Sequence, residues 1–190
     1  MVILGSSSPR RIELIQKLNV QFEVFKPLFD ESSVPLNAQD YSLKQAVGKL
    51  NSILELNKFK EDDLILCLDT SVCLNDKIYN KPKSIEEAIE FLSELSNKTH
   101  EVKTGYAIKY KDKLIERIII SKVTFNNLSK EDILFYVNNE EVLDKAGAYA
   151  IQHDEKFHII KEIEGSFFNI MGFPLEDIKK DFVSLGLINE

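Results

Sequence analysis

The sequence has no apolar run approaching the roughly 20 residues that a membrane-spanning helix needs. It also has no basic segment and cleavage site after Met1, which a secretory signal peptide would show. We therefore expect a cytoplasmic protein with no membrane partner. The formal net charge is -7, so the chain lacks the broad basic face that nucleic-acid binding requires. A small anionic ligand is still compatible with this charge if basic side chains gather locally.

Cysteine and histidine are scarce, and neither shows the spacing of a metal site. Cys67 and Cys73 fall within one strand-like region and are interpreted as buried, reduced thiols. His100, His153 and His158 share no ligand spacing and are interpreted as structural. A metal centre built from these residue types is therefore not expected.

Composition favours a globular chain that buries its core as one domain. Hydrophobic residues make up 44% of the sequence and charged residues 29%. Some segments repeat apolar side chains at helical spacing, and others are continuous or alternating apolar runs typical of strands. Helices are expected at 9–18, 41–56, 84–95, 129–139 and 175–185, strands at 2–4, 22–25, 64–68 and 157–163, and hairpins at 72–79 and 99–125.

The amino end reads as a short buried strand, a small-residue turn and the first turn of a helix. Pro9 suits the first helical position because its missing N–H would be unpaired there, which makes Ser8 the expected N-cap. Gly5 and the serines at 6–8 let the backbone come close to a ligand. This arrangement is typical of an anion site.

Two arginines, Arg10 and Arg11, stand in the first turn of this helix. The helix dipole disfavours each cation there by roughly a few tenths of a kcal/mol, so a negative group is expected to compensate them. Free N–H groups, serine hydroxyls and two guanidiniums at a helix start would bind a phosphate chain well. The alternative is a surface helix whose arginines pair with acidic neighbours such as Glu13.

Asp69 follows the continuous apolar run at 64–68, where the strand is expected to end. Ligands in α/β sheets collect beyond the ends of such strands, and partial burial tunes the basicity of a carboxylate. Asp69 is therefore a candidate for acid–base chemistry. Alternatively, it caps a turn or pairs with an arginine.

Other charged residues stand where they suit ligand contacts. Asp30 and Glu31 form an acidic pair in the polar segment 27–39, which is typical of solvated charge but is also a place for a metal or substrate ligand. Lys49 flanks an apolar helical stripe, so its stem can pack while its ammonium reaches a cleft or water. Lys81 follows the predicted hairpin.

Taken in order, these signals resemble the Maf family of nucleoside triphosphate pyrophosphatases. The resemblance covers nearly the whole chain and implies a single Maf-like domain over residues 1–190. It implies an elongated α/β fold, similar to inosine triphosphatase, with a mixed sheet, flanking helices and two lobes around a central cleft, usually in a homodimer. The matching pieces are Leu4–Arg11, Asp69-Thr70, Lys81-Pro82, Thr99–Val102 with Thr104-Gly105, Asp144–Tyr149 with Gln152, and Gly172–Leu175.

The resemblance implies hydrolysis of a nucleoside triphosphate between the α and β phosphates, giving a monophosphate and pyrophosphate. A tetraanionic triphosphate needs several cations and a divalent metal around one base before water can attack. By position in the Maf pattern, Asp69 would be the general base, and Glu31 with Asp69 would place Mg²⁺ or Mn²⁺. The implied phosphate-binding residues are Ser6, Arg10, Arg11, Lys49 and Lys81.

Substrate choice is implied by three positions. Arg10, Thr70 and Gln152 match the branch that prefers dTTP and UTP, whereas the branch favouring 7-methyl-GTP carries Trp, Gln and Glu at these places. The Gln152 amide both donates and accepts, which suits a uracil-type edge. The chain departs from the family pattern at Gly5, Cys67-Leu68, Ala150 and His153.

Two other functions stay open at this point. One is a nucleotide-binding regulator of cell division or septum formation, which would bind nucleotide without turnover. The other is a pyrophosphatase for 7-methyl-GTP or other modified purine nucleotides. Asp69 among the cations favours turnover, because a pure binder gains nothing from a carboxylate that faces phosphates.

Overall fold

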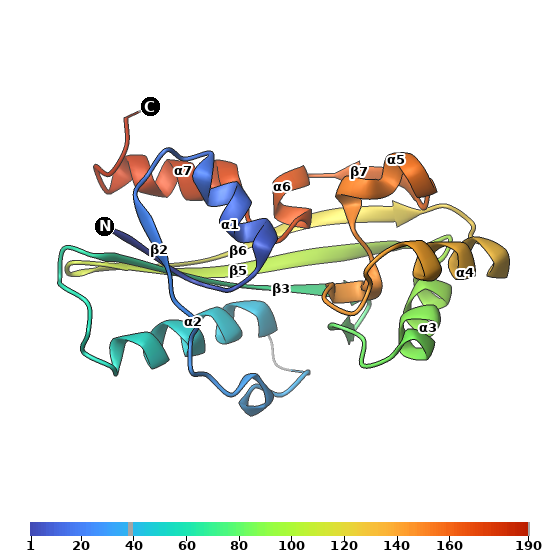
Figure 1. Ribbon diagram of the computed structural model, residues 1–190, viewed down its shortest axis with the longest axis horizontal. Coiled ribbons are helices and arrows are strands. Elements are labelled where there is room, and N and C mark those ends of the chain that lie inside the picture. Colours follow the sequence, from blue (N-terminus) through green and yellow to red (C-terminus); the bar gives the residue numbers. More distant parts are fainter. Residues whose placement is uncertain (38–39, 190) are drawn as a thin grey trace. The chain divides into compact units, whose positions relative to one another are not determined.

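The computed structural model describes residues 1–37 and 40–189, which form an α/β fold (Figure 1). In this part of the chain a seven-stranded mixed sheet has the strand order β2-β1-β3-β5-β6-β7, and β4 pairs with β3 off this path. The strands are β1 (Val2–Gly5), β2 (Phe22–Val24), β3 (Leu64–Leu74), β4 (Lys77–Tyr79), β5 (Thr99–Tyr110), β6 (Lys113–Phe125) and β7 (Ile160–Glu164). The helices are α1 (Pro9–Gln16), α2 (Tyr41–Leu54), α3 (Ile85–Leu95), α4 (Lys130–Asn139), α5 (Asp154–Phe157), α6 (Phe167–Ile170) and α7 (Leu175–Ser184). The predicted α/β class, with a mixed sheet and flanking helices, is confirmed.

The chain divides into two compact units. The first comprises Met1–Asp69, Thr104–Ile119 and Gly172–Glu190, and the second comprises Thr70–Lys103 and Ile120–Met171. Within the described residues, no helix has the length and apolar character needed to cross a bilayer. The single domain over residues 1–190 and the central cleft stay predictions.

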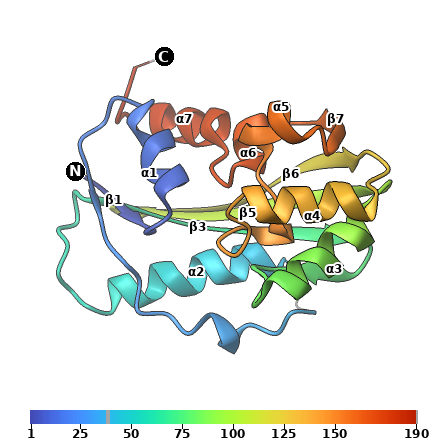
Figure 2. The same ribbon diagram turned by 45° about the vertical axis from the view of Figure 1, so that its right-hand side comes forward.

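In the first unit, the parallel pairing of β1 with both β2 and β3 builds the centre of the sheet. Val2 lies opposite Phe22 on one side and Leu64 on the other. Helix α2 covers one face, and α1 and α7 lie on the other (Figure 2). The apolar stripe predicted for α2 accounts for this placement, because it buries Leu50 and Ile53 against the sheet. The core under α2 consists of Ile3, Leu50, Ile53, Ile65, Cys67 and Ala107.

In the second unit, the helices expected at 84–95 and 129–139 and the hairpin expected at 72–79 are confirmed. The Ser129 hydroxyl and the Asp132 carboxylate form a complete capping box at the start of α4. At α3, the Ser84 hydroxyl accepts the N–H of Glu87, while the Glu87 carboxylate accepts the N–H of Lys83 rather than that of the cap. The β3–β4 hairpin turns at Asn75, which has a φ of 53°.

Most element boundaries lie close to the sequence prediction, and the largest differences are at β3 and β7. Strand β3 does not end at Asp69 but continues to Leu74, because its last residues pair with β4, with Val72 opposite Tyr79. The strand predicted at 157–163 begins only at Ile160. The Asp154 carboxylate accepts the N–H groups of Ile159 and Ile160 at 2.8 and 3.0 Å, which closes a short helix over the residues before the strand.

His100 is packed in the core of the second unit, which agrees with its structural interpretation. The residue is 1% exposed, and its ring makes edge contacts with Phe125 and Tyr149. Nε2 lies 2.9 Å from the Tyr149 hydroxyl, whereas Nδ1 is buried with no hydrogen-bond partner among the described residues. Burial lowers the pKa of this imidazole to about 4, so His100 is neutral at pH 7.

We expect the free energy of unfolding to rise with pH between about 4 and about 6.5. In that range the unfolded chain binds a proton on His100 that the folded chain, with its lowered pKa, does not bind. At pH 5 the resulting loss relative to pH 7.5 is about 2 kcal/mol. Urea unfolding of the parent and of His100→Gln at both pH values measures it. The change in the free energy of unfolding between pH 7.5 and pH 5 should be smaller in His100→Gln by this amount. An identical change in the two proteins would rule out the titration of His100 as its cause.

Candidate active site

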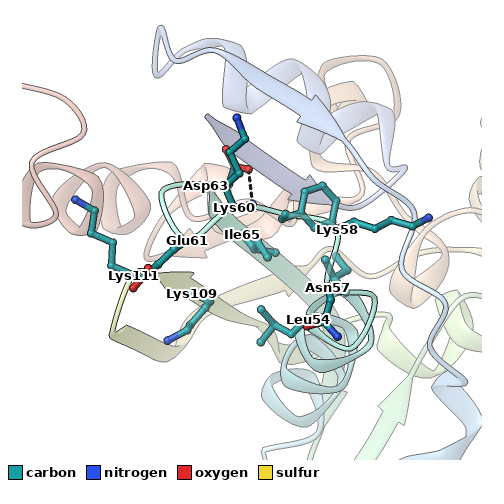
Figure 3. Close-up of a pocket in the computed structure, with 11 residues that line it drawn as sticks. Leu54, Asn57, Lys58, Lys60, Glu61, Asp63, Ile65, Lys109 and Lys111 are labelled. Atoms are coloured by element: carbon teal, nitrogen blue, oxygen red, sulfur yellow. Dashed lines mark hydrogen bonds between the residues drawn. The ribbon is translucent and has the colours of Figure 1, made fainter.

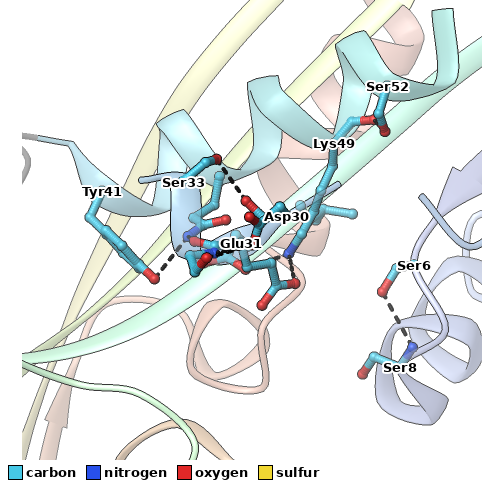
Figure 4. A network of polar contacts seen from close by, with 12 residues as sticks. Ser6, Ser8, Asp30, Glu31, Ser33, Tyr41, Lys49 and Ser52 are labelled. Atoms are coloured by element: carbon cyan, nitrogen blue, oxygen red, sulfur yellow. Dashed lines mark hydrogen bonds and ion pairs between the residues drawn. The ribbon is translucent and has the colours of Figure 1, made fainter. Parts of the chain in front are cut away.

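The ammonium of Lys49 is shared by two carboxylates in the first unit. Lys49 Nζ lies 2.6 Å from Asp69 Oδ1 and 2.8 Å from Glu31 Oε1. The Lys49 and Asp69 side chains are 10% and 15% exposed, whereas Glu31 is 61% exposed. Figure 4 shows the Lys49 side chain extending from α2 toward the segment that carries Glu31. The largely buried Asp69 and Lys49 are therefore in direct contact, and the exposed Glu31 joins them from the protein surface.

Local structure explains how these groups meet. The residues of β3 before Asp69 are buried, with Leu68 fully so, and they anchor the strand in the sheet. Helix α2 packs on this sheet, and Lys49 belongs to its buried face together with Leu50 and Ile53. The lysine stem is thus covered while its terminal nitrogen reaches Asp69, as the sequence predicted for its amphipathic side chain.

Burial gives Asp69 the character of a base. Removal of the carboxylate from water raises its pKa, and the positive charges of Lys49 and Arg11 act in the opposite direction. The net pKa lies above the usual value of an aspartate. A carboxylate with a raised pKa accepts a proton from water more readily than an exposed aspartate does.

Arg11 ties three segments of the first unit together. Its Nε donates to the carbonyl oxygen of Gly172 at 2.9 Å, and its Nη1 donates to the carbonyl oxygen of Leu68 at 2.8 Å and to Ser6 Oγ at 3.2 Å. Burial lowers the pKa of the guanidinium, and the negative charge of Asp69 raises it. Because Leu68 directly precedes Asp69, Arg11 helps to fix the backbone that carries the acid.

The predicted strand, turn and helix at the amino end are confirmed, with one difference at the cap. Pro9 begins α1 and Ser8 occupies the N-cap position, but the Ser8 side chain makes no capping hydrogen bond. Instead, the N–H of Ser8 donates to Ser6 Oγ at 3.3 Å, and both serines are labelled in Figure 4. Ser6 is buried and accepts from Arg11 as well, so it connects the turn with the guanidinium.

The structure brings five predicted site residues into one connected group. Arg10 is half-buried on α1 and directly precedes Arg11 in the sequence. Three other predicted residues belong to the second unit: Thr70 is half-buried in β3, Lys81 is exposed after β4, and Gln152 is half-buried in a short 3₁₀ helix. The connected group consists of Ser6, Arg11, Glu31, Lys49 and Asp69.

Sequence reasoning missed a buried amide in this neighbourhood. Gln45 is 1% exposed, and its Nε2 donates to the backbone oxygen of Glu31 at 2.7 Å and to the Tyr41 hydroxyl at 2.8 Å. The available signal was its position one turn before Lys49 on the same helix, since residues four apart lie on one face.

The carboxylates suit a hard divalent cation only in combination with other ligands. Among the described residues, no group of three or more His, Cys, Asp or Glu side chains is placed to hold a metal ion. Glu31 and Asp69 nevertheless converge on one cationic nitrogen. Mg²⁺ is commonly held by one or two carboxylates together with substrate phosphates, so this pair fits such an ion when a nucleotide supplies further oxygens.

A pocket of about 160 Å³ elsewhere in the first unit does not coincide with this group (Figure 3). Its walls include Ile53 and Ile65, and Lys58 and Lys111 extend from it in opposite directions. Its two other lysines are Lys60 and Lys109, and the acids Glu61 and Asp63 also line it. None of the predicted site residues lines it. We place the candidate active site at Asp69 instead.

The chain is similar over nearly its whole length to a family model and to curated proteins. The family model described as Maf-like protein matches residues 1–183. A dTTP/UTP pyrophosphatase from Thermosipho africanus is 39% identical over 188 residues, covering 99% of this chain and 95% of the relative. Proteins with the same name from Clostridium botulinum (strain Okra / Type B1) and Clostridium acetobutylicum are 35% identical over 190 residues and 37% identical over 196 residues. The alignments cover 98% of this chain in both cases and 97% and 98% of the two relatives, respectively.

Proposed function

Because the chain belongs to the Maf family, we propose that it hydrolyses dTTP and UTP between the α and β phosphates, releasing a nucleoside monophosphate and pyrophosphate. The observation that carries this proposal is the Asp69 carboxylate held 2.6 Å from the Lys49 ammonium. Hydrolysis of a phosphoanhydride uses a base that accepts the proton of water and a cation that offsets the charge of the phosphates, and this pair supplies one of each.

In the proposed mechanism Asp69 orients a water molecule and accepts its proton as the oxygen attacks the α phosphorus. Its raised pKa supports this role, because a stronger base transfers the proton more readily. The Lys49 ammonium donates hydrogen bonds to the phosphate oxygens and stabilises the negative charge that develops on them. The hydrogen bond from Arg11 to the Leu68 carbonyl oxygen helps to fix the backbone next to Asp69, so that the carboxylate keeps its direction.

Glu31 and Asp69 would hold the divalent cation, Mg²⁺ or Mn²⁺, with phosphate oxygens as the other ligands. When bound, such an ion neutralises phosphate charge and lowers the pKa of a coordinated water. The Lys49 contacts with both carboxylates support this assignment, because they mark a point where the protein already accommodates positive charge. The carboxylates would bind through oxygen atoms, which are the ligands that hard cations such as Mg²⁺ and Mn²⁺ prefer.

The remaining roles are proposed from the family pattern. Phosphate contacts are assigned to Ser6, Arg10, Arg11, Lys49 and Lys81. The selection of a pyrimidine is assigned to Arg10, Thr70 and Gln152, the last through its paired donor and acceptor. The names of the relatives support a pyrimidine substrate. The predicted homodimer and cytoplasmic location stay predictions.

The test is a panel of nucleotides with purified protein and Mg²⁺ or Mn²⁺. We expect the highest kcat/KM for dTTP and UTP, at least about 10-fold above that for 7-methyl-GTP and ITP, since matched hydrogen bonds to a base edge discriminate by more than about 1.4 kcal/mol. Faster hydrolysis of a purine nucleotide would overturn the pyrimidine assignment. Saturable binding of dTTP without any product would favour the non-catalytic regulator instead.

A further inference from the structure

Glu31 lies in a short turn whose own hydrogen bonds make it compact. It begins a 3₁₀ helix, Glu31–Ser33, with Asp30 as the N-cap. Asp30 Oδ1 accepts the N–H and the hydroxyl of Ser32 at 3.0 and 2.6 Å, and the Ser33 hydroxyl donates to the Asp30 backbone oxygen at 2.6 Å (Figure 4). The turn is otherwise exposed, so its placement against α2 depends on contacts made by the helix.

Three parts of α2 lie against this turn or against Phe29, which precedes it. Gln45 Nε2 donates to the Glu31 backbone oxygen at 2.7 Å, and Lys49 Nζ reaches the Glu31 carboxylate at 2.8 Å. Between them in the sequence, Gly48 leaves room for the ring of Phe29, since a Cβ on Gly48 would lie 2.2 Å from Phe29 Cζ. The helix therefore holds both the backbone and the side chain of Glu31.

The orientation of the Gln45 amide is set by Glu31. Its Oε1 is buried and has no hydrogen-bond partner among the described residues, whereas its Nε2 has two. Turned the other way, the amide would bring an oxygen against the Glu31 backbone oxygen, and two acceptors repel each other. The observed orientation leaves the buried Oε1 unpaired, which costs free energy. The hydrogen bond that Nε2 donates to Glu31 therefore favours this orientation of the amide.

We propose that Gln45 is a positioning residue for the reaction: by holding the Glu31 backbone, it keeps the Glu31 carboxylate beside Lys49 and Asp69. This inference rests on the proposed function for the part that concerns catalysis. The Glu31 side chain is 61% exposed, and without this bond its carboxylate would explore many positions in solvent. Groups that orient a ligand of a metal change metal affinity by about 10- to 100-fold when they are removed.

The experiment compares the parent with Gln45→Met, which keeps the length of the side chain and removes the donor. We expect the Mn²⁺ concentration for half-maximal activity to rise about 10-fold. The same shift is expected in Mn²⁺ binding, followed by electron paramagnetic resonance with a dTTP analogue that has a non-hydrolysable α–β bridge. Urea unfolding should show a small change, because the substitution also removes the unpaired Oε1. Gln45→Leu, a second variant without a donor, is expected to behave in the same way.

Two controls separate positioning from a general effect on the helix. Tyr41→Phe removes the other partner of Nε2 but leaves the bond to Glu31, so it should stay within about twofold of the parent. In a Glu31→Gln background, Gln45→Met should lower kcat/KM no further, because the carboxylate on which it acts is already absent. An equal loss in both backgrounds, or an equal effect of Tyr41→Phe, would overturn the proposal.

The two proposals fail in different ways. A parent protein that hydrolyses no nucleotide removes the proposed function, and the comparison of Mn²⁺ binding then decides on Gln45 alone. An active parent whose Mn²⁺ affinity is unchanged by Gln45→Met removes the positioning role and leaves the proposed function in place.

Discussion

Asp69→Asn is expected to lower kcat for dTTP at least about 100-fold, which is the low end of what a general base contributes. The amide keeps the size of the side chain but cannot accept the proton of the attacking water at neutral pH. The fold should persist, because Lys49 retains its contact with Glu31 at 2.8 Å. Single-turnover hydrolysis with saturating nucleotide measures the chemical step, and urea unfolding measures the stability of the variant.

Asp112→Asn is the matched control for this substitution. Asp112 is an exposed acid in the turn between β5 and β6, so its replacement makes the same change in charge away from Lys49. The control should keep the activity of the parent. Hydrolysis by Asp69→Asn at the rate of the parent would contradict the assignment of the base.

Gly105→Ala is expected to destabilise the protein by about 3 kcal/mol, near the upper end for overpacking in a core. A Cβ at Gly105 would lie 2.3 Å from the backbone nitrogen of Leu43 and 2.4 Å from the carbonyl carbon of Ser42. These atoms belong to the first turn of α2, and backbone cannot step aside as the end of a side chain can. The helix that carries Lys49 would therefore have to move off β5. Urea unfolding measures the loss, and the kcat/KM for dTTP shows whether the shift reaches the site.

Gly186→Ala provides the comparison, because it separates contact from backbone conformation. Gly186 has a φ of +72°, and no atom lies within 4 Å of the position that a Cβ would occupy there. Alanine at this position therefore meets only the cost of a left-handed backbone, about 1 kcal/mol. Gly105, in contrast, is limited by the neighbouring helix. Equal stability of Gly105→Ala and the parent would mean that α2 does not approach β5 this closely.

The sequence predicted the helices and hairpins where the signal is local. The apolar stripe of α2 depends on residues within a few positions of one another, and it is present. The helix expected at 129–139 is present as α4, and a local capping box at Ser129 begins it. The end of β3 was predicted incorrectly because Asp69 interrupts an apolar run. In the folded chain Lys49 forms an ion pair with Asp69. The pairing of Val72 with Tyr79 extends the strand beyond Asp69.

The candidate site was predictable as a set of residue types but not as a set of contacts. A cation in the first turn of α1 suggested a phosphate ligand, whereas Arg11 also donates to the backbone of Leu68 and Gly172, far away in the sequence. Periodicity places Gln45 on the same helix face as Lys49, but it could not predict the bond to Glu31, because Glu31 lies in a segment with no regular pattern. Such contacts follow from the tertiary arrangement, which one sequence does not display.

The most direct test of the account is the identification of the products formed from dTTP in ¹⁸O-labelled water. Attack on the α phosphorus, with Asp69 as the base, predicts equimolar dTMP and pyrophosphate, with the label in dTMP. Formation of dTDP and orthophosphate, or label in the pyrophosphate, would contradict it.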